Sequence, residues 1–148
     1  MSRANSWAAA TSSARCTKTA SSRPWWRKKA SKSKPPEPVT GTIRDYHVHV
    51  YFGAASRDPA RSLRAEVERH FDVVMGRWHE QLVGPHPRWM YLFVFQPDLF
   101  AEIVPWLMRN RQGLVLLLHP STGNHIADHT DYAVWMGEVL ELDLSVLP

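Results

Sequence analysis

Cysteine is almost absent from this sequence: Cys16 is the only one in 148 residues, so no disulfide can form within the chain. Such scarcity suits a reducing compartment. The sequence also lacks a run of about eighteen apolar residues, the length that spans a bilayer, and it lacks the apolar segment of a secretory signal. We therefore expect a cytoplasmic protein without disulfides and without membrane contact.

Lysine is missing after residue 40, and acidic residues are almost missing before it. Residues 1–40 hold nine of the 18 basic residues and one acid, Glu37, whereas residues 41–148 hold nine arginines and thirteen acids. The basic charge of the chain thus belongs to its first 40 residues. Because the remainder is acidic on balance, we expect no nucleic-acid binding by that part.

The first 40 residues are rich in Ser, Ala and basic side chains and have no sustained apolar period. Such a segment buries too little apolar surface to offset its ordering entropy, which predicts a disordered tail over 1–40 and one domain over 41–148. Transit peptides share this composition. An unstructured leader, a transit peptide, a basic arm for nucleic acid and a start codon placed too far upstream remain alternatives.

The apolar patterns of the domain predict four strands: three over 42–52, 77–83 and 88–95, and a fourth, buried one from the continuous apolar run over 114–119. Apolar residues at three- and four-residue spacing predict helices over 59–75, ended by Gly76, and over 97–110, where Pro105 weakens the pattern. For the last 29 residues we expect loops and one short helical piece around 131–136. The order βαββαβ is that of the ferredoxin-like plan.

We therefore predict an α+β fold with a four-stranded antiparallel sheet and two helices on one face. Right-handed crossovers give the strand order fourth, first, third, second. The other face is left for a partner, the C-terminal segment or a ligand.

All eight histidines lie in the domain, and two of them alternate in the strand "YHVHVYF", residues 46–52. His47 and His49 share one face of that strand, opposite Tyr46, Val48, Val50 and Phe52. The predicted topology brings His79 and His119 to the same end of the sheet, and it leaves His86 at the far end unless the hairpin folds back or a second subunit supplies it.

Four converging imidazoles on a sheet face favour a metal site, because uncompensated imidazoles there cost desolvation energy. The domain offers no thiolate, so histidines with an open position suit zinc hydrolysis or non-haem Fe(II) oxygen chemistry. Asp45 is a further ligand candidate on the same face, although a solvated carboxylate at the strand start is preferred. Asp128 is a weaker candidate.

The strings "YHVHVYF", "RWHEQLVGPHP" and "VPWLMRNRQGLVLLLHPSTGNHIADHTDYAVWMG" resemble the DOPA 4,5-dioxygenase family of small ferredoxin-like proteins, from about Ile43 to the C-terminus. The resemblance implies extradiol cleavage of a catechol ring by Fe(II) and O₂, with zinc as the alternative metal in the isolated protein. It implies functional roles for six positions: His47, His49, His79, His86, His119 and His129.

Among these six, we expect His47, His49 and His119 as metal ligands, and His79, His86 and His129 as catalytic acid–base or substrate-orienting residues. Tyr51, Trp89 and Tyr91 either line the substrate ring or pack within the sheet. Arg109 and Arg111 are candidates for a substrate carboxylate, with helix-end capping as the alternative. The expected partners are a catechol, O₂ and a second copy in a homodimer. The alternatives are a non-catalytic metal-binding or dimerising module and a zinc hydrolase or lyase.

Overall fold

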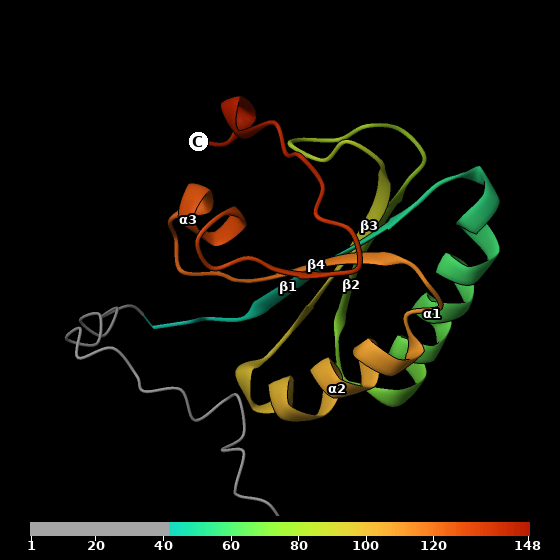
Figure 1. Ribbon diagram of the computed structural model, residues 1–148. Helices are drawn as coiled ribbons and strands as arrows, with labels where there is room; N and C mark the ends of the chain where they lie inside the picture. The colour runs from blue at the N-terminus through green and yellow to red at the C-terminus, as the bar shows by residue number, and fades with distance from the viewer. Residues whose placement is uncertain (1–41) are drawn as a thin grey trace, which may run out of the picture. The chain divides into compact units, whose positions relative to one another are not determined.

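The computed structural model describes residues 42–148. The predictions for residues 1–40, whether disordered tail or transit peptide, lie outside the described residues. Within the described part, the domain is an α+β fold built on one antiparallel sheet (Figure 1).

The sheet has five strands in the order β2-β3-β1-β4-β5. The strands are β1 (Tyr46–Phe52), β2 (Val74–His79), β3 (Trp89–Phe95), β4 (Val115–Pro120) and β5 (Val134–Met136). The order of the first four strands is the predicted one. The expectation of a four-stranded sheet is wrong, because β5 pairs antiparallel with β4 and adds a fifth strand at that edge.

Helices α1 (Arg57–His70) and α2 (Phe100–Asn110) lie on one face of the sheet, and α3 (His125–His129) with the C-terminal segment lies on the other (Figure 1). Three short 3₁₀ turns complete the described elements: Ala54–Ser56, Pro97–Leu99 and Leu144–Val146. None of the helices in residues 42–148 has the length and apolarity that a membrane span requires.

Strand β1 is buried on both faces, and its alternation follows the prediction. Val48, Val50 and Phe52 join the main core beneath α1 and α2. Tyr51 belongs to a second, smaller apolar cluster on the opposite face, where Leu140 of the C-terminal segment packs against it. The face left uncovered in the prediction is therefore covered in part by the chain's own C-terminal residues.

The first helix ends earlier than predicted, and the second strand begins earlier. Helix α1 stops at His70, where Phe71 adopts extended backbone angles. Phe71, Val73 and Met75 then alternate into the core, while Val74, which lies within the helix predicted over 59–75, is 71% exposed. The period over these residues is thus two and not 3.6, and the strand replaces the last helical turn.

The C-terminal region also differs from the prediction of a helical piece around 131–136. Residues 134–136 form β5, and the helix lies earlier, as α3. Its start is marked by Asn124, whose side-chain oxygen accepts a hydrogen bond from the backbone N–H of Ala127 at 3.1 Å. This is an ordinary N-cap signal that sequence reasoning missed.

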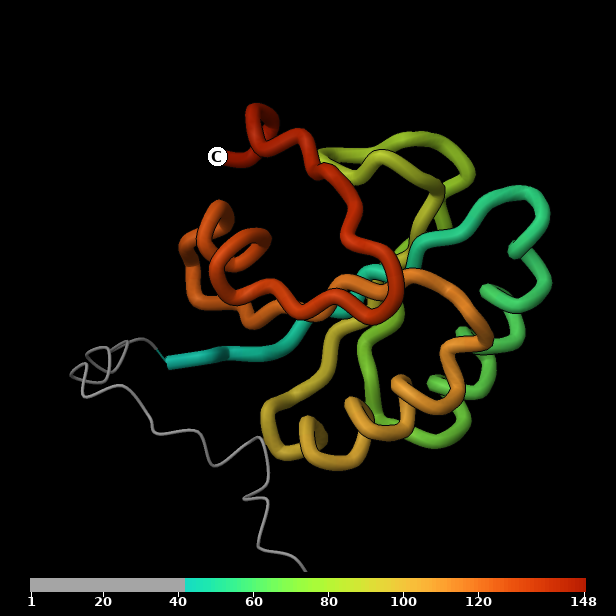
Figure 2. Tube along the Cα trace, in the orientation of Figure 1, coloured from blue at the N-terminus to red at the C-terminus, as the bar shows by residue number. Residues whose placement is uncertain are grey.

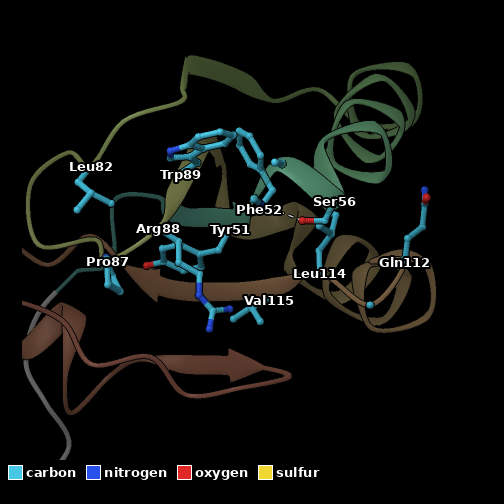
Figure 3. Close-up of a pocket in the computed structure, with 13 residues that line it drawn as sticks. Tyr51, Phe52, Ser56, Leu82, Pro87, Arg88, Trp89, Gln112, Leu114 and Val115 are labelled. Atoms are coloured by element: carbon cyan, nitrogen blue, oxygen red, sulfur yellow. Dashed lines mark hydrogen bonds between the residues drawn. The ribbon is translucent and has the colours of Figure 1, made fainter.

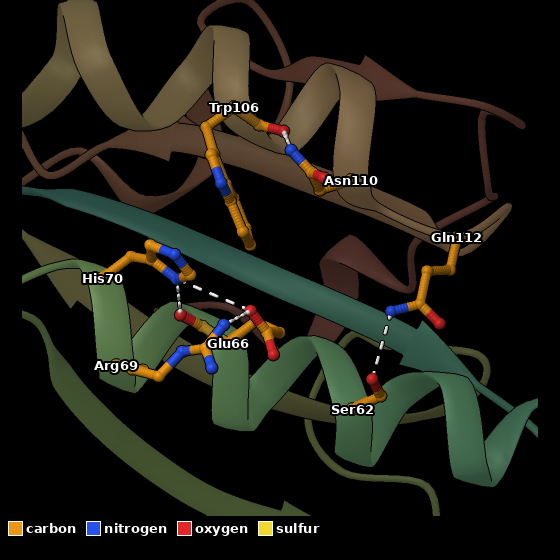
Figure 4. Close-up of polar contacts among 7 residues, drawn as sticks. All are labelled: Ser62, Glu66, Arg69, His70, Trp106, Asn110 and Gln112. Atoms are coloured by element: carbon orange, nitrogen blue, oxygen red, sulfur yellow. Dashed lines mark hydrogen bonds and ion pairs between the residues drawn. The ribbon is translucent and has the colours of Figure 1, made fainter.

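Helices α1 and α2 lie side by side, and His70 of α1 faces Trp106 of α2 (Figure 4). The ring of His70 lies 5.5 Å from the ring of Trp106, and its Nδ1–H donates to the carbonyl of Glu66 at 2.8 Å. His70 thus belongs to the helical layer, on the side of the sheet away from the other histidine clusters.

Gly76 lies in β2 and does not end a helix as predicted. A Cβ at this position would lie 2.8 Å from the backbone oxygen of Leu92 on β3. We expect Gly76→Ala to lower the free energy of unfolding by about 1–3 kcal/mol, because the two strands must separate to admit the methyl group. Urea unfolding would measure the change. Gly53→Ala is the matched control, since its Cβ would meet nothing within 4 Å, and equal losses in both variants would contradict this account.

Candidate metal centre

Two neighbouring strands supply three histidines to the second face of the sheet. In the β1–β4 ladder His47 lies directly opposite His119, and His49 follows two residues later on the same face of β1. His49 and His119 are buried, at 5% and 3% exposure, and their Nε2 atoms are 3.1 Å apart. One ligand atom from each of the three histidines lies within 4.8 Å of the others.

Helix α3 supplies a fourth histidine, His129, at its last position. The His129 ring lies 4.1 Å from the His119 ring and 5.7 Å from that of His49. Asp128 fixes this helix to the end of β4: its Oδ1 accepts from Thr122 Oγ1 at 2.6 Å and its Oδ2 from the Thr122 N–H at 3.1 Å. Asp128 therefore positions α3, and both of its oxygens are occupied in doing so.

The β2–β3 loop supplies a fifth histidine, His86. The loop folds back over the sheet face, and the C-terminal segment runs beside it (Figure 2), where the Asp143 N–H donates to the carbonyl of Pro85 at 3.0 Å. His86 becomes 94% buried, with 6% exposure, and its ring lies 4.2 Å from the ring of His49. The hairpin thus does fold back, which was the condition set for His86 to approach the others.

Backbone carbonyls determine the tautomer of two of these imidazoles. His119 Nδ1–H donates to the carbonyl of Pro120, and His129 Nδ1–H donates to the carbonyl of His125, each at 2.8 Å. Because a carbonyl only accepts, the neutral form of either ring carries its lone pair on Nε2. His49 Nε2–H then donates to His119 Nε2. Fixing Nδ1–H in this way is how proteins orient metal-binding histidines.

Burial sets the protonation of the cluster. It lowers the pKa of His86 and that of His119 to about 4. It lowers the pKa of His49 well below its usual range, and neighbouring imidazoles add to that effect. Burial also lowers the pKa of His47, against the opposing influence of Asp45. These four rings are therefore neutral at pH 7, which is the state that binds a metal ion.

The arrangement fits a metal ion. The described residues contain two overlapping histidine triads, His47–His49–His119 and His49–His86–His129, which share His49. Two nitrogens bound to one ion at 2.0–2.2 Å lie about 2.8–3.6 Å apart, a range that includes the 3.1 Å between His49 and His119. In addition, His49 Nδ1 is buried and has no hydrogen-bond partner among the described residues.

A cavity of about 560 Å³ lies beside the cluster, at the end of β1 (Figure 3). Tyr51 contacts both the cavity and the histidine cluster: it lines the cavity, and its hydroxyl lies 2.7 Å from His86 Nδ1. Trp89 and Val115 provide apolar walls, and Arg88 provides a cation that pairs with Glu138 at 2.8 Å.

Five of the six predicted histidines come together, and the convergence expected for His79 is wrong. His79 ends β2 instead of beginning it and pairs with Met90, at the Tyr51 end of the sheet. It is in neither triad. The cause is the early start of β2 at Val74: His79 is the last residue of β2, whereas in the strand predicted over 77–83 it lay near the beginning.

The other candidates from the sequence are the acid Asp45, the aromatic residue Tyr91 and the arginines Arg109 and Arg111, and none of them belongs to a histidine triad. Asp45 lies 3.1 Å from His47 Nε2 and is in neither triad. Tyr91 points into the core, where Arg64 lies 5.3 Å above its ring, so it cannot line this site. Arg111 Nη1 donates to the carbonyl of Leu114 at 2.7 Å, in the loop between α2 and β4. Arg109 is exposed on α2.

The neutral histidines make the metal-free protein sensitive to acid. Their pKa values are lower in the folded state than in the unfolded chain, so unfolding takes up protons between about pH 4 and 6.5, and stability falls as the pH drops through that window. Melting temperatures of chelator-treated protein across this range would measure the effect.

The variant His119→Gln should reduce this proton uptake by about one proton. His125→Gln, at an exposed position, serves as the control and should keep the wild-type slope. A melting temperature that stays flat from pH 7 to pH 5 would contradict the neutral, buried state of the cluster.

Comparison with known proteins identifies the family of this chain. Residues 46–146 match the model of the Dopa 4,5-dioxygenase family. A DOPA 4,5-dioxygenase of Amanita muscaria is 32% identical over 115 residues, covering 72% of this chain and 50% of that protein. An uncharacterized 21.2 kDa protein of Botryotinia fuckeliana is 36% identical over 133 residues, covering 81% of this chain and 73% of the relative.

One solved structure is also similar to this chain. The crystal structure of a candidate dioxygenase from Nostoc punctiforme has 47% sequence identity and a TM-score of 0.70, covering 71% of this chain and 91% of that one. With a family match over residues 46–146 and relatives of this similarity, the chain belongs to the Dopa 4,5-dioxygenase family.

Proposed function

We propose that this protein is a non-haem Fe(II) dioxygenase that opens a catechol ring by extradiol cleavage with O₂. Membership of a family named for a dioxygenase supports oxygenase activity. The observation that carries the finer proposal is the convergence of five histidines, four of them kept neutral by burial, on one face of the sheet.

We assign His47, His49 and His119 as the ligands of the metal. Three neutral imidazoles suit iron and zinc alike, so zinc in the isolated protein would be compatible with this site. The chemistry that a bound ferrous ion supplies is the activation of O₂ toward a catechol held beside it. The protein's part is to hold the three rings in place, which the β1–β4 ladder does.

His129 and His86 complete the site as substrate-orienting or proton-handling residues. His129 presents an Nε2 lone pair, because its Nδ1–H is engaged by the carbonyl of His125. It is therefore able to accept a proton from a catechol hydroxyl that reaches the cluster. His79, which lies outside both triads, has no part in this proposal.

The cavity beside Tyr51 is the place we propose for the side chain of the substrate. It borders the histidine cluster at Tyr51 and at Pro87, the neighbour of His86. Arg88 is its cation, so a catechol with an anionic side chain, as in an amino acid, suits it better than an unsubstituted ring. The homodimer and the cytoplasmic location expected from the sequence stay predictions.

Oxygen consumption tests the proposed reaction. Protein loaded with Fe(II) under anoxic conditions and then given catechols and O₂ should consume one O₂ per ring and form a yellow ring-opened product. His49→Ala should abolish metal binding and turnover, because His49 belongs to both triads. His79→Ala, the matched control, should retain both.

Two outcomes would overturn this proposal. One is that no catechol from a broad panel consumes O₂ while iron is bound, which would favour a non-catalytic module. The other is turnover that zinc supports and that needs no O₂, which would favour a hydrolase or lyase.

The role of Arg88 has its own test in substrate selectivity. We expect Arg88→Gln to raise the KM for a carboxylate-bearing catechol by about tenfold, the loss of one charge-assisted contact, and to leave the KM for unsubstituted catechol unchanged. Glu138→Gln is the control: it frees Arg88 from its ion pair and should lower the first KM. Equal effects of Arg88→Gln on both substrates would exclude Arg88 from recognition.

A further inference from the structure

Two sets of ligands are available to a metal ion, His47–His49–His119 and His49–His86–His129, and the contact between Tyr51 and His86 distinguishes between them. Tyr51 Oη lies 2.7 Å from His86 Nδ1, in a buried setting where the tyrosine is 2% and the histidine 6% exposed. The hydrogen of this bond belongs either to the tyrosine or to the imidazole, and each choice has a different consequence for His86.

If His86 Nδ1–H were the donor, the hydroxyl hydrogen of Tyr51 would need a second acceptor. No other hydrogen bond of this hydroxyl exists among residues 42–148. The hydroxyl hydrogen of Tyr51 would then be buried without an acceptor, which costs free energy. If Tyr51 O–H is the donor, one bond satisfies both buried atoms.

We propose that Tyr51 O–H donates to His86 Nδ1 and thereby holds His86 as the Nε2–H tautomer. His86 then presents an N–H, and not a lone pair, beside His49, whose ring is 4.2 Å away. Its tautomer is the reverse of that of His119 and His129, whose Nδ1–H groups are engaged by backbone carbonyls. His49 can move its Nε2 hydrogen to Nδ1, which has no partner among the described residues, whereas Tyr51 occupies Nδ1 of His86. The metal ion is therefore held by His47, His49 and His119, and His86 is a hydrogen-bond donor to whatever the ion binds.

This assignment makes Tyr51 a positioning residue that acts through His86. It rests on the proposed function only for its effect on turnover, because the tautomer and the ligand set are properties of the protein without substrate. Tyr51 also lines the cavity, so a molecule bound in the cavity would contact the residue that fixes the tautomer of His86.

The first test is the tautomer itself. Long-range ¹H–¹⁵N correlation spectra of the imidazoles at pH 7, with His86 assigned through His86→Gln, should give a protonated Nε2 and an unprotonated Nδ1 in the wild type. Tyr51→Phe should convert His86 to a mixture of tautomers or to Nδ1–H. Tyr91→Phe is the matched control, since Tyr91 is also buried and its hydroxyl has no partner within the described residues; it should leave the spectrum unchanged. A protonated Nδ1 on His86 in the wild type would overturn the proposal.

The second test is metal affinity, measured by competition with a chelator. His86→Ala should change the affinity for Fe(II) or Zn(II) by less than about threefold, whereas His119→Ala should weaken it by more than about 100-fold, beyond the loss typical of an outer-shell residue. Equal losses in the two variants would make His86 a ligand and refute the assignment, whether or not the protein proves to be a dioxygenase. If it is one, Tyr51→Phe should lower kcat by about 100-fold, the lower end of general acid–base effects, without loss of metal.

Discussion

The pairing of β1 with β4 is the constraint on which the rest of this structure depends. Because β1 is buried on both faces, its side chains have two different tasks: Val48, Val50 and Phe52 pack beneath the helices, while His47 and His49 point the other way. The β4 register then places His119 directly opposite His47. A slip of one residue in this ladder would turn the imidazoles into the apolar core and bury them without partners.

Burial and backbone hydrogen bonds together prepare the cluster for a metal. Desolvation keeps the imidazoles neutral, and the carbonyls of Pro120 and His125 decide which nitrogen of His119 and His129 carries the lone pair. A neutral, preorganised set of this kind loses little free energy when an ion binds, because the rings are already in place and only the Nε2 hydrogen of His49 must move to the unpartnered Nδ1. The apolar residues around Tyr51 and Leu117 exclude water from one side of the same face.

Sequence reasoning found those features that a local pattern encodes. The period of two in β1, the two helices and the order of four strands all followed from apolar spacing and topology. The early start of β2 was missed because Phe71 and Val74 continue the three- and four-residue apolar spacing of the preceding helix, although Phe71, Val73 and Met75 are the residues that pack against the core. The place of His86 was not predictable, since it depends on contacts with Tyr51, 35 residues away, and with the C-terminal segment at Asp143. Asn124, in contrast, was a capping signal available in the sequence.

The central claim is that the histidines of β1 and β4 hold a ferrous ion. X-ray absorption spectroscopy at the iron edge, on protein loaded under anoxic conditions, tests it most directly. The account predicts imidazole scattering from three histidines, with Fe–N distances of about 2.0–2.2 Å, similar to those of zinc sites, and the loss of that scattering in His49→Ala. Iron surrounded only by oxygen, or scattering that is the same in the wild type and in His49→Ala, would contradict it.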